Sequence, residues 1–115
     1  MLARSASASP VAYARTAAHE AVHAVQIEHL GGLQAAVDYL GSGELRAVRE
    51  ADAYAAGLWV EFLLTGGLPA PDPALASIAS GLYHLDPEDV ALARGVIVSH
   101  LPTIAAGLCP PLAVA

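Results

Sequence analysis

Cysteine and basic residues are both scarce in this chain of 115 residues. The single cysteine, Cys109, excludes a disulfide within the chain and argues against zinc held by cysteines, so we expect a cytoplasmic protein. Only five residues are Lys or Arg, the formal net charge is -6, and no basic run is present. A chain without a basic patch does not suit nucleic acid, and we predict no nucleic-acid partner.

Long hydrophobic runs are also missing. The most apolar stretch, residues 53–64, is too short to cross a bilayer and carries Glu61, so we expect no membrane span. Residues 1–9 lack the apolar centre of a secretion signal and are predicted to be a flexible leader. We expect one domain over residues 10–108, followed by a tail at 109–115.

Apolar residues make up 56% of the chain and charged residues only 14%. This composition predicts a folded protein with a core that needs neither disulfides nor a structural metal. It also leaves room for an exposed apolar patch, and hence for a homo-oligomer or a separate partner protein.

Helix signals dominate the chain. Ser9-Pro10 is typical of a helix start, and residues 11–30 contain no Gly or Pro, so we predict a helix that Gly31-Gly32 ends. A second, strongly apolar and therefore central helix is predicted over 50–65. Residues 33–48 suggest instead a small hairpin, two short strands around the sequence Gly-Ser-Gly.

Two further helices are predicted in the second half. The third spans 74–85, after a proline-rich loop. The fourth begins at Pro87, with Asp86 as its cap and acidic residues in its first turn. We expect Pro102 to break or kink this helix, because proline lacks the amide hydrogen that a helix interior needs.

The stretch "AHEAVHA" carries the chemistry of the chain. His19-Glu20-Ala21-Val22-His23 matches H-E-x-x-H, and residues four apart lie on one face of a helix. Both imidazoles can then bind one zinc ion, while Glu20 stands beside it as a general base towards a water whose pKa the zinc lowers. Two surface histidines on an alanine-rich helix are the simpler alternative.

A third ligand is needed, and the sequence offers four candidates. His29 has metzincin-like spacing, but Gln26 replaces the glycine that would turn the chain back. Glu50 opens the second predicted helix. Glu61 is the one charged residue in an apolar run. It is a candidate either as a zinc ligand or as the hydrogen-bond acceptor for the second N–H of a ligand histidine. Asp72 lies at the mouth of the third helix.

A family resemblance favours one of these candidates. The segment "YARTAAHEAVHAV" resembles the H-E-A-G-H helix of FtsH-type zinc metallopeptidases, and "AYAAGLWVEFLLTGG" and "PDPALASIA" are similar to two later segments of that family. The resemblance implies that zinc is bound by His19, His23 and Asp72, with Glu61 supporting them. Val22 departs from the family glycine, and no P-loop is present, so the likeness is to a stand-alone peptidase domain without the ATPase module.

The prediction is therefore a mainly helical, zincin-like metallopeptidase domain with at most a small β-hairpin. It binds zinc through His19, His23 and Asp72, uses Glu20 as general base, and takes a peptide or protein as substrate. The competing hypothesis is a non-catalytic helical interaction domain descended from such a peptidase, with or without zinc.

Overall fold

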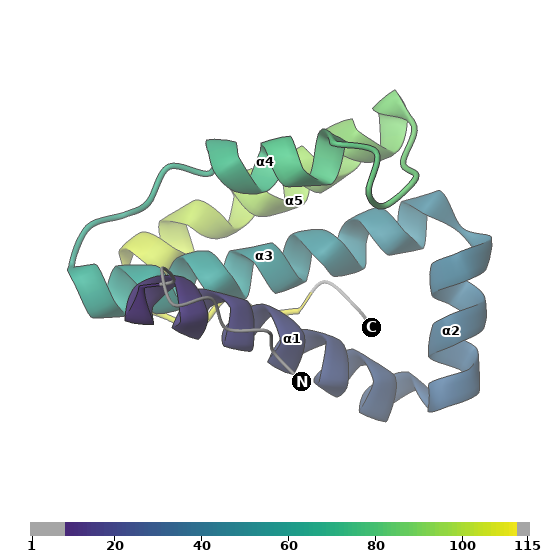
Figure 1. The fold of residues 1–115 in the computed structure, drawn as a ribbon, viewed down its shortest axis with the longest axis horizontal. Helices are drawn as coiled ribbons and strands as arrows, with labels where there is room; N and C mark the ends of the chain where they lie inside the picture. The colour runs from purple at the N-terminus through teal and green to yellow at the C-terminus, as the bar shows by residue number, and fades with distance from the viewer. Residues whose placement is uncertain (1–8, 113–115) are drawn as a thin grey trace.

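The computed structural model describes residues 9–112, which form five helices (Figure 1). They are α1 (Pro10–Leu30), α2 (Gly32–Gly41), α3 (Gly43–Thr65), α4 (Asp72–Ala79) and α5 (Pro87–Ala105). The predicted mainly helical fold is confirmed. The predicted leader falls almost entirely on residues 1–8, and the end of the predicted tail on 113–115, both outside the described residues.

The helix α3 is the centre of the molecule. It packs most extensively against α1 on one side and α5 on the other, while α4 lies along α5 and α2 stands crosswise at the end where α1 and α3 are joined (Figure 1). Small residues of α3 are fully buried between these neighbours, namely Ala47, Ala51 and Ala55. Ile78 of α4 and Ile97 and Ile104 of α5 complete the core. Because alanine is small, the backbones can approach closely and α3 can be covered on several sides.

The helix starts expected at residues 10 and 87 are correct, whereas the second predicted helix begins at residue 43 and not at residue 50. The Ser9 side chain accepts a hydrogen bond from the Ala12 amide, and the Asp86 side chain accepts one from the Asp89 amide. Each satisfies an amide of a first helical turn that has no partner within the helix. Gly31 and Gly66 end α1 and α3 with positive φ angles of 83° and 77°.

The predicted hairpin over 33–48 is wrong. That segment forms α2 and the first turns of α3, and no strand occurs anywhere in residues 9–112. The sequence Gly-Ser-Gly is a helix junction and not a strand turn, because the Ser42 side chain accepts from the Leu45 amide and caps α3. In α2, Gln34 donates to Asp38 at 2.7 Å, one helical turn away.

In the second half of the chain, the third helix differs from prediction at both ends and begins at residue 72 and not at residue 74. The third helix ends at Ala79 and not at residue 85, because the chain then takes left-handed backbone at Gly81 (φ 90°) and His84 (φ 53°). Pro102 does not break α5, which continues to Ala105, and the alternative of a kink at this residue stays a prediction. The amide hydrogen that proline lacks would bond to the carbonyl of Val98, a residue that is half exposed.

Candidate metal centre

A close approach between α1 and α3 creates the site. Gly57 lies against Arg15, and a Cβ atom at position 57 would come within 2.8 Å of the Arg15 Cγ. Arg15 in turn pairs with Glu61. This contact holds the two helices together one turn from His19.

Polar side chains then follow each other along the α1–α3 interface. Antiparallel packing places His19 against Tyr54, with ring centroids 4.4 Å apart in an edge-to-face arrangement. The next turn of α1 brings His23 to Glu50. A further turn on, the Gln26 Nε2 donates to the Arg49 carbonyl at 3.2 Å. The helical repeat of both sequences therefore sets the residues opposite one another.

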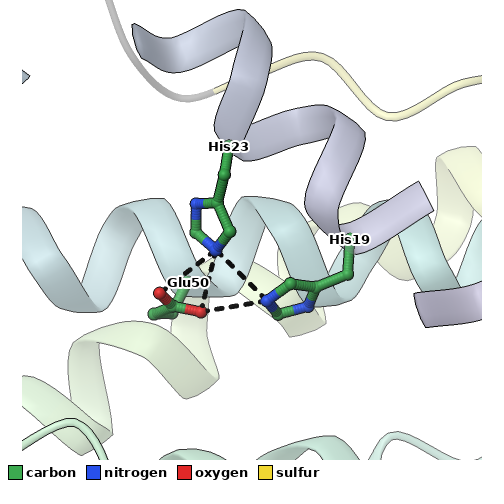
Figure 2. A group of neighbouring side chains, drawn as sticks. All are labelled: His19, His23 and Glu50. Atoms are coloured by element: carbon green, nitrogen blue, oxygen red, sulfur yellow. Dashed lines mark hydrogen bonds and ion pairs between the residues drawn. The ribbon is translucent and has the colours of Figure 1, made fainter. Parts of the chain in front are cut away.

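His19, His23 and Glu50 converge on one point (Figure 2). The Nε2 atoms of the two histidines are 3.2 Å apart, and they lie 3.1 and 3.2 Å from the Glu50 Oε1. The Glu50 side chain is only 3% exposed, so its charge is not stabilised by solvent and depends on the neighbouring side chains. Among residues 9–112 this is the group of His, Cys, Asp and Glu side chains that could hold a metal ion.

The dimensions of this triangle fit a metal ion. In a tetrahedral zinc site with bonds of about 2.0–2.1 Å, any two ligand atoms lie about 3.3 Å apart. The observed N–N and N–O separations of 3.1 to 3.2 Å are within about 0.2 Å of that value. Two imidazoles and one carboxylate are also a donor set that zinc accepts, with a fourth position left for water.

Gln26 orients His23 for such a role. Because its Nε2 donates to the Arg49 carbonyl, its Oε1 faces the His23 Nδ1 at 3.0 Å and can only accept. The hydrogen of the neutral imidazole is thereby assigned to Nδ1, and the Nε2 lone pair is directed at His19 and Glu50. Tyr39 fixes the carboxylate in the same way, since its hydroxyl donates to the Glu50 Oε2 at 2.6 Å.

The pKa shifts of Glu50 and His23 favour an ionised carboxylate beside a positive charge. Burial raises the pKa of Glu50, but hydrogen bonds from His19, His23 and Tyr39 outweigh it and lower that pKa to about 2. Burial lowers the pKa of His23, while the hydrogen bond and charge of Glu50 raise it above its ordinary value.

Glu20 is exposed and borders two hollows beside the site. One, of about 460 Å³, is lined also by His23 and Glu50, and the other, of about 210 Å³, by His19. Within residues 9–112 the Glu20 carboxylate has no hydrogen bond or ion pair, which leaves it available to a bound molecule.

The structure does not bring Asp72, Glu61 or His29 into the triangle. Asp72 is exposed at the first residue of α4, Glu61 pairs with Arg15, and His29 is exposed in the last turn of α1. Glu50 occupies the place that the resemblance gave to Asp72. Sequence reasoning assigned Glu50 little weight because no motif match placed a ligand there and an exposed helix start was the simpler interpretation.

Comparison with known proteins leaves the family open. No family model, curated protein or solved structure matches the chain. The resemblance to FtsH-type peptidases therefore stays a prediction. In the described part of the chain, no helix is both long enough and apolar enough to span a membrane.

Proposed function

We propose that this domain binds one zinc ion through His19, His23 and Glu50 and hydrolyses peptide bonds. The observation that carries the proposal is the triangle of ligand atoms, 3.1 to 3.2 Å on each side, with the carboxylate of the H-E-x-x-H motif next to it. The neighbouring hollow of about 460 Å³ is within the size range of small-ligand sites.

In this proposal the zinc ligands, Glu20 and the orienting side chains have separate roles. Bound zinc would act as a Lewis acid and make a water molecule easier to deprotonate. Glu20 would accept a proton from the attacking water as the water oxygen bonds to the peptide carbonyl carbon, and would return the proton to the amide nitrogen as the C–N bond breaks. The products are one carboxylic acid and one amine, so one water is consumed for each bond cleaved. Gln26 and Tyr39 keep His23 and Glu50 oriented.

Glu20→Gln tests this mechanism directly, because the amide keeps the shape of the side chain and cannot accept the proton. Zinc-loaded wild type is expected to cleave members of a peptide library, and Glu20→Gln to cleave them at least about 100-fold more slowly with unchanged zinc content. Glu28→Gln, on an exposed position of the same helix, is the matched control and should cleave like wild type. Equal cleavage by wild type and Glu20→Gln, or none by either, contradicts the proposal.

A non-catalytic zinc-binding interaction domain is the second candidate. The observation that favours it is α2, because a helix in the segment predicted as a hairpin offers no strand edge along which a peptide could be aligned. This candidate predicts stoichiometric zinc in wild type and no zinc-dependent cleavage of any peptide. The same library measurement separates the two functions.

A further inference from the structure

Three charged residues within one turn of α3 are buried, and each faces a different neighbour. Glu50 meets the two histidines and Tyr39, and Asp52 meets His100 of α5 at 3.2 Å. Arg49 is only 4% exposed, yet its best contact with a charged group is Asp38 of α2 at 3.5 Å, the outer limit of a hydrogen bond. Its Nε and Nη1 have no hydrogen-bond partner at all.

A buried guanidinium in this state is unusual. Burying a charge is costly unless the group is paired and its hydrogen bonds are made, and arginine carries five N–H donors in a fixed planar arrangement. One weak contact to Asp38 leaves most of that arrangement unused. Asp38 is itself shared, because Gln34 also donates to its carboxylate at 2.7 Å.

Arg49 lines the hollow of about 460 Å³ that also borders His23, Glu50 and Glu20. The rest of the lining is mainly apolar or small and comes from the end of α1 and from α2, including Ile27, Ala35, Ala36 and Leu40. A single hollow is thus lined by two of the three candidate metal ligands, by the proposed base and by a guanidinium with unused hydrogen-bond donors, in mainly apolar surroundings.

We infer that Arg49 binds a carboxylate of the ligand in this hollow, so that the domain selects peptides carrying a carboxylate close to the bond at the metal. A carboxylate can take two parallel N–H bonds from a guanidinium, and these bonds are strong where water is excluded. The carboxylate comes either from the peptide's own C-terminus or from an aspartate side chain. The identification of the ligand as a peptide rests on the proposed function, whereas the carboxylate preference rests on Arg49.

Binding of four short peptides to the zinc-loaded and the metal-free protein tests this inference by calorimetry. Acetyl-alanyl-leucine and its amide differ only in the terminal carboxylate. Acetyl-alanyl-aspartate amide and the asparagine equivalent differ only in the side-chain carboxylate. Wild type is expected to bind at least one acid about tenfold or more tightly than its amide partner, and the pair that responds identifies the source of the carboxylate. Equal affinity within both pairs overturns the inference.

Two variants assign the preference to Arg49. Arg49→Met keeps an unbranched apolar chain and is expected to abolish the preference, lowering the affinity for the acid by about 30-fold or more. Arg94→Gln, an exposed arginine of α5, removes the same charge elsewhere and should leave the preference intact. If Arg49→Met keeps the preference, the metal and not Arg49 binds the carboxylate, and the inference is wrong.

Asp38→Asn is an independent test, because it should raise the affinity for the acid peptide where Arg49→Met lowers it. The substitution removes the carboxylate that competes for Arg49. The acid peptide should therefore bind more tightly to Asp38→Asn than to wild type, while the affinity for the amide peptide should not change. Weaker or unaltered binding of the acid contradicts the inference even if Arg49→Met does not fold. If the protein hydrolyses no peptide, the proposed function is wrong. The binding measurements still test whether Arg49 binds a carboxylate.

Discussion

At the scale of single residues, the site depends on Gln26, which replaces the glycine of the metzincin spacing. The prediction from sequence treated this residue only as an obstacle to a third histidine. In the structure it is 2% exposed and joins the His23 ring to the Arg49 carbonyl. Its role is invisible in the motif because it depends on a backbone group 23 residues away.

Gln26→Leu should therefore weaken zinc binding although Gln26 is not a ligand. Loss of a supporting hydrogen bond to a ligand histidine lowers metal affinity by about 10–100-fold. Gln26→Glu keeps an acceptor for the His23 Nδ1 hydrogen and should restore most of that affinity, which a purely packing role would not allow. Competition with a chromophoric zinc chelator measures both, with Gln34→Leu on exposed α2 as control. Equal affinities for all three variants and wild type contradict the assignment.

The pKa shifts predict how zinc affinity depends on pH. Glu50 stays ionised across the neutral range because its pKa is about 2. His23 has a raised pKa, so its proton competes with zinc more strongly than an ordinary imidazole would. Apparent affinity should fall as pH drops from 8 to 5.5, by about tenfold per pH unit for each proton displaced. Affinity that does not change over this range would show that the histidines are not ligands.

The metal-free protein should show the opposite trend. A raised folded-state pKa means that the contribution of His23 to stability is fully present below its ordinary pKa of about 6.5 and is lost as pH rises through the folded value. The metal-free free energy of unfolding should therefore decrease from pH 6 to 8, and this decrease should be absent in His23→Gln. Urea titrations at each pH measure it.

At the scale of the helices, Gly57 allows the α1–α3 contact that brings the ligands together. A methyl group at this position must displace Arg15, so Gly57→Ala should lower the free energy of unfolding by about 1–3 kcal/mol and weaken zinc binding. Gly95→Ala in α5 is the matched control, because nothing lies within 4 Å of the added Cβ. It should raise stability by up to about 1 kcal/mol. Similar effects of the two substitutions would contradict the close-contact explanation.

Element boundaries explain how much of the site the sequence could predict. Serine and aspartate caps and terminal glycines act locally, so α1 and the start of α5 were predicted correctly from them. The segment 33–48 was misassigned because Gly41, Ser42 and Gly43 suit both a hairpin turn and a helix junction. The same error placed the candidate Glu50 at a helix start, whereas it lies two turns inside α3 and is buried in contact with side chains of α1 and α2.

At the scale of the whole molecule, a metal bound between α1 and α3 links stability to zinc concentration. A ligand held only by the folded state at 100 times its Kd adds about 2.7 kcal/mol, or roughly 10 °C in Tm for a domain of this size. The Tm should fall by this amount on addition of a strong chelator and recover with added zinc. A Tm that is indifferent to both would favour a metal-free helical bundle with a fortuitous motif.

The claim on which the account depends is that two imidazoles of α1 and the Glu50 carboxylate of α3 bind one cation. Zinc stoichiometry by elemental analysis, on untagged wild type, Glu50→Gln and Asp72→Asn prepared in parallel, tests it most directly. The account predicts one zinc per chain in wild type and Asp72→Asn and a large loss in Glu50→Gln. Zinc retained by Glu50→Gln, or lost from Asp72→Asn, would contradict it.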